Sequence, residues 1–297
     1  MLAWCDAANR VSRLAGRGRV RFFRRMHVSG LFIYPVKSLR GIALEEAAFD
    51  ALGLVGDRRF LVIDENNEML TQRAHPKMAT VATALSADTL TLSADDAGSI
   101  AISRASDPSA PLRVTSVWGS NPLKTEDCGE APAEWLSSVL GVRCRLVRIG
   151  REFVRPVKKF AVPGDVVSFA DGYPFLVANE ASLADLNARI VERGGETVPM
   201  DRFRPNIVIA DAEAFAEDHW PRIDIDGVVL RSGGPCSRCI MTTQDQRSGE
   251  RRGPEPLRTL ATFRRDAEEP TAVNFAQNFI PETKSGILRV GASVQVK

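Results

Sequence analysis

Two cysteines lie three positions apart in the segment 233–249, GGPCSRCIMTTQDQRSG. Cys236 and Cys239 enclose Ser237 and Arg238, so a fixed positive charge stands beside both thiols. A neighbouring cation favours the thiolate, which is the form of cysteine that binds soft metals and attacks electrophiles. The segment therefore indicates metal or thiol chemistry.

Several uses of a lone C-x-x-C pair compete. A structural zinc site needs four ligands, and the other cysteines and the histidines are scattered along the chain. A thioredoxin-like pair places its first cysteine at the start of a helix, whereas the β-branched residues in 240–243 predict a strand. Two interpretations stay open: two small buried side chains that happen to be close, or one thiolate that completes a metal held mainly by a cofactor.

The cysteine segment and four other motifs resemble one protein family. Residues 236–249 are similar to the C-terminal signature of the MOSC proteins, the molybdenum cofactor sulfurase C-terminal domain family. The resemblance is strongest to the branch of the mitochondrial amidoxime-reducing components and their bacterial relatives that reduce N-hydroxylated bases. The other motifs are YPVKS at 34–38, GDR at 56–58, EASLADLN at 180–187 and FRPNI at 203–207. They follow the family order from about residue 28 to the end of the chain.

The resemblance implies a molybdenum cofactor, whose pterin dithiolene supplies two sulfur ligands to the metal. It assigns Cys239 as the metal ligand and catalytic residue, with Arg238 keeping it deprotonated and Cys236 as a packing residue or outer neighbour. Guanidinium groups suit the pterin phosphate. The residues that the resemblance assigns to cofactor binding are Lys37, Ser38, Arg58, Arg204, Asn206, Ser237 and Arg238.

The resemblance also implies an activity, the reduction of the N–O bond in small N-hydroxylated substrates such as amidoximes or hydroxylamines. The alternative is a non-catalytic carrier of the molybdenum cofactor or of sulfur. The chain shows neither the cysteine spacing of a plant-type ferredoxin nor a G-x-G-x-x-G fingerprint. We therefore expect a separate ferredoxin or flavoprotein reductase to deliver the electrons.

Composition describes an ordinary globular protein. The 297 residues are 44% hydrophobic and 26% charged, and the net charge of +2 is too small to indicate nucleic acid as a partner. The cysteine count of 5 is odd and irregularly spaced, which favours a reducing compartment, and we expect the cytoplasm. No apolar run approaches the ~20 residues that a membrane span needs.

The periodicity predicts many strands and two clear helices. Apolar alternation predicts strands that include 28–33, 60–63, 69–72, 89–92, 100–102, 142–149, 207–209 and 287–296. Asp226-Gly227 predicts a hairpin turn within 222–231. Apolar residues at helical spacing predict helices over 130–140 and 180–193, with Asn179 or Ser182 as the cap of the second.

These elements predict a mostly β protein with a few helices, an α+β fold. The resemblance implies an N-terminal β-barrel-like domain, which we place at 26–149, followed by a MOSC β-barrel domain at 150–297. Residues 1–25 hold seven arginines against one acid. We expect a disordered basic extension, or an upstream start codon with the functional protein beginning near Met26, although the composition resembles a transit peptide.

Overall fold

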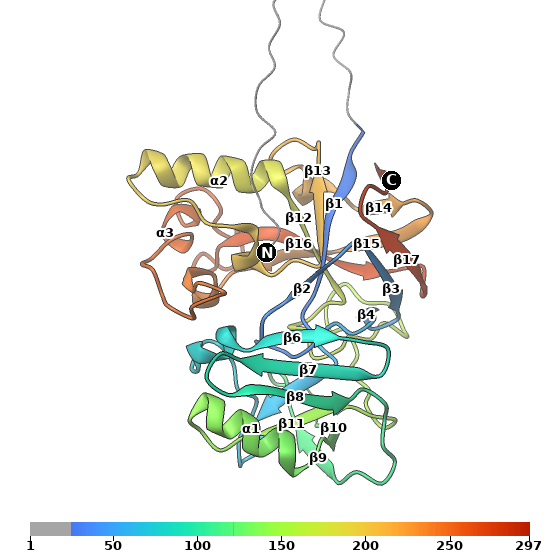
Figure 1. The fold of residues 1–297 in the computed structure, drawn as a ribbon. Helices are drawn as coiled ribbons and strands as arrows, with labels where there is room; N and C mark the ends of the chain where they lie inside the picture. The colour runs from blue at the N-terminus through green and yellow to red at the C-terminus, as the bar shows by residue number, and fades with distance from the viewer. Residues whose placement is uncertain (1–24, 121) are drawn as a thin grey trace, which may run out of the picture.

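The structure is a computed structural model that describes residues 25–120 and 122–297. Most of the first half of the chain forms the lower part of the molecule in Figure 1, and most of the second half forms the upper part. The strands are β1 (His27–Ile33), β2 (Ile42–Leu44), β3 (Glu46–Asp50), β4 (Gly53–Leu54), β5 (Phe60–Ile63), β6 (Ala82–Leu85), β7 (Thr89–Ala94), β8 (Gly98–Ser103), β9 (Leu112–Thr115), β10 (Leu123–Asp127), β11 (Arg145–Ile149), β12 (Phe175–Asn179), β13 (Ile207–Ala210), β14 (Arg222–Ile225), β15 (Val228–Ser237), β16 (Asn274–Pro281), β17 (Gly286–Arg289) and β18 (Val294–Val296). The α-helices are α1 (Glu130–Leu140), α2 (Glu180–Glu192) and α3 (Leu257–Leu260), and the 3-10 turns are η1 (Pro76–Thr80), η2 (Met200–Phe203), η3 (Ala216–His219) and η4 (Ile240–Thr243).

The strands form four open sheets. The largest has eight strands in the order β18-β14-β15-β16-β12-β13-β1-β2, and a four-stranded sheet has the order β5-β11-β10-β9. Two smaller sheets contain β17-β3-β4 and β6-β7-β8. The mostly β, α+β class is confirmed, whereas none of the four sheets closes into the expected barrel among the described residues.

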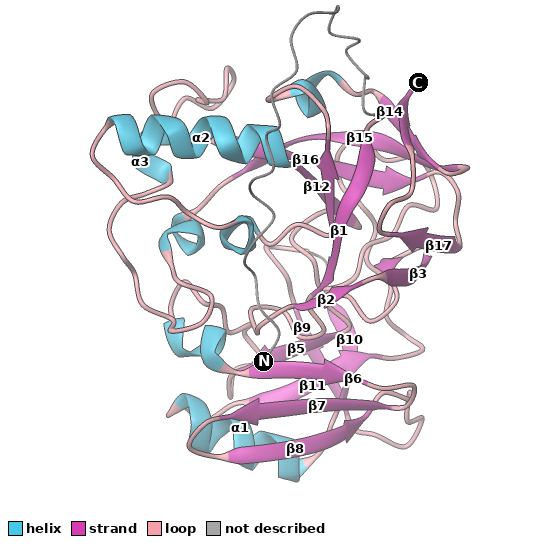
Figure 2. Ribbon diagram, turned by 45° about the horizontal axis from the view of Figure 1, so that its top comes forward, coloured by secondary structure: helices cyan, strands magenta, loops and turns pink. Residues whose placement is uncertain are grey.

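The large sheet joins the two ends of the chain. β1 pairs with β13 and β2, so residues from the start of the chain lie beside strands of the second half. Figure 2 shows β1 and β2 running from the upper sheet toward the lower part of the molecule. The predicted boundary between residues 149 and 150 stays a prediction, and the predicted basic extension lies outside the described residues except for Arg25.

The two clear helix predictions are confirmed. α1 covers the predicted residues and ends at Gly141, which adopts a left-handed conformation. α2 begins after Asn179, whose side chain accepts a hydrogen bond from the backbone N–H of Ala181. α2 connects β12 to the parallel strand β13, which forms a β-α-β unit within the large sheet. The predicted hairpin at Asp226-Gly227 is also present, between β14 and β15.

Three strand predictions are wrong. Residues 240–243 form η4, because the hydroxyl groups of Thr242 and Thr243 bond back to the carbonyls of Cys239 and Ile240. Residues 69–72 contribute a single bridge from Met69 to Ile63, since the chain then turns at Thr71, whose carbonyl accepts hydrogen bonds from the backbone N–H groups of Ala74 and His75.

The third wrong prediction is the long terminal strand. Residues 287–296 divide into parts of β17 and β18 around Gly291, whose φ of +86° takes the backbone out of the extended region. The two parts join different sheets, β17 through β3 and β18 through β14.

Two large apolar clusters form most of the core. One packs β1, β3, β12, β13 and β14 around buried aromatic residues such as Phe49, Phe175 and Phe279. The other packs β5, β7 and α1 around Val62, Leu90 and Leu136. Within 25–120 and 122–297, no helix has both the length and the apolar character needed to cross a bilayer.

Candidate cofactor site

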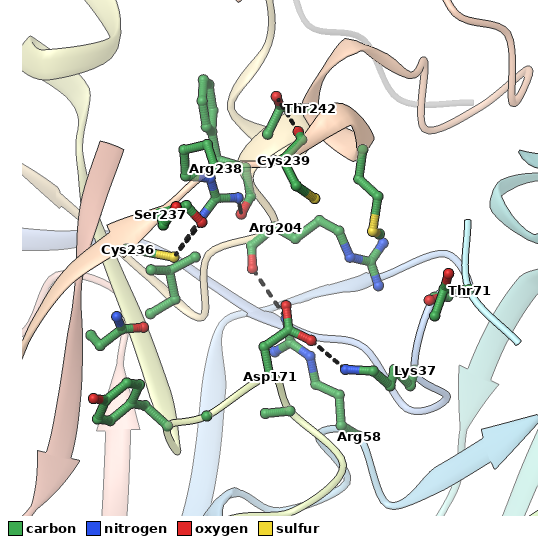
Figure 3. A pocket seen from close by; sticks show the side chains of 18 of the residues that line it. Lys37, Arg58, Thr71, Asp171, Arg204, Cys236, Ser237, Arg238, Cys239 and Thr242 are labelled. Carbon is green, nitrogen blue, oxygen red and sulfur yellow. Dashed lines mark hydrogen bonds and ion pairs between the residues drawn. The ribbon is translucent and has the colours of Figure 1, made fainter. Parts of the chain in front are cut away.

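A pocket between the two parts of the molecule collects the predicted site residues. All eight line its wall, although four separate segments of the chain supply them: Lys37, Ser38, Arg58, Arg204, Asn206, Ser237, Arg238 and Cys239. Figure 3 shows the charged side chains converging from several directions. Their convergence is a property of the tertiary structure, whereas their roles as cofactor and metal ligands stay predictions.

Lys37 lies buried at the pocket wall, in the loop that follows β1. Its Nζ donates to the carbonyl of Phe169 at 2.9 Å and pairs with the carboxylate of Asp171. Burial lowers the pKa of Lys37, and the Asp171 carboxylate partly opposes this shift. The Asp171 carboxylate is largely exposed, and the ammonium of Lys37 beside it holds the pKa of that carboxylate well below its usual range. The two groups therefore form a charged pair at the pocket wall (Figure 3).

Two arginines stack on the buried ring of Tyr34. The guanidinium carbons of Arg58 and Arg204 lie 4.3 and 4.1 Å from the ring centroid. Arg58 donates to both carboxylate oxygens of Asp57 and to the side-chain oxygen of Asn206. Asp57 in turn accepts from the backbone N–H of Tyr34. This network fixes the cations before any ligand arrives.

Arg204 links the two halves of the chain. Its Nη2 donates to the carbonyl of Leu39 at 2.9 Å, and its Nη1 donates to Oε1 of Gln246 at 3.0 Å. Burial lowers the pKa of Arg204 to about 10 and raises the pKa of Tyr34 to about 12. At neutral pH the guanidinium is charged and the phenol is protonated, so the pocket holds net positive charge.

The cysteine segment differs from its prediction in one contact. Arg238 turns its Nη1 to the sulfur of Cys236 at 2.8 Å, and its Nη2 donates to the carbonyl of Phe203. The expected partner of the Arg238 guanidinium was Cys239, yet Figure 3 shows the contact with Cys236. Burial raises the pKa of the Cys236 thiol, and the Arg238 cation opposes part of that rise. Cys236 therefore lies in the pocket wall and forms a hydrogen bond with Arg238, so its role is more than apolar packing.

The surroundings of the two cysteines differ from those of a thioredoxin-like pair, although not for the reason expected from the sequence. Residues 240–243 are helical, but η4 follows Cys239, the second cysteine. Cys236 lies inside β15, so the first cysteine does not gain the field of a helix N-terminus.

Several pocket residues were missed from the sequence. Asp171 accepts a hydrogen bond from Nε1 of Trp118 at 2.7 Å as well as pairing with Lys37. The guanidinium of Arg73 lies 4.4 Å from the Trp118 ring. Neither Asp171 nor Trp118 carries a local signal, because only the fold brings them to the site. Arg202 immediately precedes the FRPNI motif, two positions before Arg204, and that spacing could have indicated it.

The donor set fits an anionic cofactor that carries a soft metal. No group of three or more histidine, cysteine or acidic side chains capable of holding a metal occurs in the part of the chain that the structure describes. A metal here would depend on ligands from a cofactor, with Cys239 as the soft protein donor. The Nε atoms of Arg202 and Arg238 are buried without a hydrogen-bond partner in that same part. Such unsatisfied donors are costly unless an acceptor binds.

Comparison with known proteins shows the family to which the chain belongs. Residues 25–143 match the model of the MOSC N-terminal beta barrel domain, and residues 164–295 match the MOSC domain. The mitochondrial amidoxime-reducing component 1 of Mus musculus is 37% identical over 297 aligned positions, which cover 94% of this chain and 85% of that protein. The chain belongs to the MOSC-domain family. Its relatives also include component 1 of Homo sapiens, 36% identical over 90% of this chain and 82% of that protein, and component 2 of Bos taurus, 34% identical over 85% and 76%.

Residues from both matched domains line the pocket. Lys37, Ser38 and Arg58 lie in the part that matches the N-terminal model, whereas the residues from Arg204 onward lie in the MOSC domain match. The resemblance found in the sequence motifs is confirmed over most of the chain.

Proposed function

We propose that this protein reduces small N-hydroxylated compounds with a bound molybdenum cofactor. The observation that carries the proposal is the convergence of Cys239 and the motif cations on one pocket. Relatives that align with 85–94% of this chain are named amidoxime-reducing components, which supports the substrate class. Reduction of N–OH to N–H consumes two electrons and two protons and releases water.

The residues of this chain would hold the cofactor and position the substrate. The cofactor supplies the two-electron redox chemistry when it is bound. Arg204, Arg58 and Lys37 would neutralise its phosphate, while Ser38, Asn206 and Ser237 would donate or accept neutral hydrogen bonds. Cys239 would supply the protein's sulfur ligand to the metal. The Lys37–Asp171 pair would keep a charged, oriented wall around the reacting group.

The electron donor in this proposal is a separate ferredoxin or flavoprotein. Its support is that the five cysteines in the 297 residues lack the spacing that a plant-type iron–sulfur cluster needs. We also keep the cytoplasm as the predicted location, supported by four free cysteines among the described residues. The relatives themselves are named for mitochondria.

Metal analysis and a substrate screen test the proposal together. The protein would be produced in a host that makes the molybdenum cofactor, and its molybdenum would be measured by mass spectrometry. Reduced methyl viologen would then drive a screen of amidoximes, hydroxylamines and N-hydroxylated bases. We expect close to one molybdenum per chain and consumption of at least one substrate class. Full metal content without any reduction would instead favour the carrier function.

A further inference from the structure

Two exposed aromatic side chains near the pocket adopt strained backbone conformations. Trp118 is 39% exposed and Phe160 is 64% exposed. Their φ angles of +49° and +55° lie in the left-handed region, which bulky residues disfavour. Strain at an exposed aromatic residue is not offset by its own burial, and such positions concentrate at functional surfaces.

Trp118 belongs to the pocket wall, and Phe160 lies next to the cysteine segment that forms another part of that wall. Trp118 donates from Nε1 to Asp171. The Nζ of Lys158 donates to the carbonyl of Gly119 at 2.8 Å, so the segment that carries Phe160 adjoins Trp118. The ring of Phe160 lies against Gly234, where a Cβ would approach it to 3.0 Å. Gly234 precedes Cys236 by two positions in β15, which places the Phe160 ring beside the cysteine segment.

Several arginines lie near Trp118. Arg73 stacks on Trp118, and Nη2 of Arg251 donates to the Arg73 carbonyl at 2.7 Å. Arg247 is exposed and lies with Arg251 in the turn formed by residues 244–251. Nε2 of Gln244, in this turn, donates to the carbonyl of Pro76 in the first half of the chain. Both acidic residues of this turn are close to arginines, Asp245 to Arg202 and Arg252, and Glu250 to Arg252. Positive charge therefore predominates on this part of the surface.

We propose that these residues form a docking surface for an acidic electron-transfer protein. The surface, called the mouth surface below, consists of Arg73, Trp118, Lys158, Phe160, Arg247 and Arg251. An apolar centre with a basic rim suits a transient contact, in which complementary charge speeds the encounter and a small apolar area limits its lifetime. The inference rests on the proposed function, because only a redox enzyme needs this partner.

The number of electrons that the reaction consumes determines how many times the partner must dock. A reduced [2Fe–2S] ferredoxin gives up one electron and is oxidised, so two docking events supply the two electrons for each N–OH group. Two protons complete the conversion to N–H and water. Docking over the pocket shortens the path from the partner to the cofactor.

A binding experiment tests the mouth surface without any turnover. Cofactor-loaded protein would be titrated with an acidic plant-type ferredoxin by isothermal calorimetry at low ionic strength. Arg247→Glu and Arg251→Glu should each raise Kd about 3- to 10-fold, and the difference should shrink as salt rises and the Debye length falls from ~30 Å at 0.01 M to ~8 Å at 0.15 M. Phe160→Asn should also raise Kd, since asparagine tolerates the left-handed conformation while removing the ring.

Arg193→Glu is the matched control. Arg193 is exposed at the end of α2, is not one of the residues of the mouth surface, and makes no ion pair in the described part of the chain. Its variant should bind ferredoxin like the wild type. Equal Kd values for Arg193→Glu, Arg247→Glu and Arg251→Glu would overturn the proposal.

Turnover separates this inference from the proposed function. With reduced ferredoxin, Arg247→Glu and Arg251→Glu should lower kcat/KM by a similar 3- to 10-fold, while reduced methyl viologen should drive all variants at the wild-type rate. Turnover with methyl viologen and undiminished ferredoxin turnover in both variants would contradict the mouth surface alone. Specific ferredoxin binding without turnover from either reductant would contradict the proposed activity and still support the docking surface.

Discussion

Cys239 and Cys236 share a pocket but have different surroundings. Cys236 contacts the Arg238 guanidinium, whereas Cys239 carries no such contact and precedes η4. A soft metal completed by cofactor sulfurs needs one further thiolate. The residue-scale predictions therefore treat the two thiols separately.

Cys239→Ala should abolish molybdenum retention, because it removes the proposed protein ligand. Cys236→Ala should leave most of the metal in place, although it frees one guanidinium donor of Arg238. Molybdenum per folded chain, measured after gel filtration, decides between them. Full metal content in the Cys239 variant would refute the ligand assignment.

Cys236 should be alkylated only slowly at neutral pH. Burial raises the pKa of its thiol, so the reactive thiolate is scarce below that pKa. In cofactor-free Cys239→Ala protein, the rate of Cys236 modification by iodoacetamide should rise with pH and reach its midpoint above the ~8.5 of a free cysteine. Arg238→Gln should move the midpoint higher still, since it removes the cation that favours the thiolate.

Peptide mass spectrometry would follow Cys236 separately from the other thiols. Cys128 and Cys144 also have raised pKa values because of burial, that of Cys128 reaching about 12. A midpoint for Cys236 at or below the free value would contradict the structure.

At the scale of elements, ion pairs to the buried carboxylate of Asp127 connect strands β9, β10 and β11. Asp127, at the end of β10, accepts hydrogen bonds from Nε of Arg113 at 2.9 Å and Nε of Arg145 at 2.6 Å. The backbone N–H of Gly129 also donates to it. Burial opposes ionisation of Asp127, yet these donors lower its pKa overall.

Asp127→Asn should therefore destabilise the protein by about 1–3 kcal/mol at pH 7, because two part-buried guanidinium groups lose the carboxylate that they share, although Arg145 keeps its pair with Glu130. A folded-state pKa below the unfolded value of about 3.9 contributes stability above that value, and the contribution disappears as pH falls through the folded pKa. The difference in unfolding free energy between wild type and variant should hence narrow below about pH 4. Urea unfolding at pH 7 and pH 3.5 would measure it, and a constant difference would contradict the prediction.

At the scale of the whole molecule, the pocket is also a joint between the two halves of the chain. Arg204 contacts the carbonyl of Leu39 from one half and Gln246 from the other. Gln72 similarly donates to the carbonyl of Ser38 and to Gln246. The residues that would bind the cofactor therefore also hold the halves together, so cofactor binding and domain association should be coupled.

Arg204→Gln should lower cofactor occupancy more than it lowers fold stability. One charge-assisted hydrogen bond is worth about 1.5–3 kcal/mol, which corresponds to a loss of cofactor affinity of at least about 10-fold. Arg264→Gln is the matched control, because Arg264 forms a buried ion pair with Asp218 outside the pocket wall. Molybdenum content and Tm would be measured for both variants.

The control variant should melt early and retain the cofactor. If the folded fraction of Arg204→Gln carried full cofactor while its Tm fell, Arg204 would be a structural residue only.

Local sequence was sufficient to predict the elements that begin or end at a residue with a strong capping or turn preference. The Asn179 cap, the Gly141 stop and the Asp226-Gly227 turn act within a few residues, so α2, α1 and the β14–β15 hairpin were predicted correctly. The motifs of the site could also be recognised in the sequence, since each is a short run of adjacent residues. Cys239, Arg204 and Lys37 could therefore be chosen as candidates before their positions were known.

Only the tertiary structure decided how those candidates meet. The strand predicted at 240–243 became η4 because threonine hydroxyls bond to the local backbone, which β propensity does not include. Asp171 and Trp118 joined the site through contacts with Lys37 and with each other across 134 and 53 residues of sequence. The contact of the Arg238 guanidinium with Cys236, and not with Cys239, also depends on the tertiary structure. The direction of a side chain is set by the backbone conformation around it, and no pattern of residue types specifies that direction.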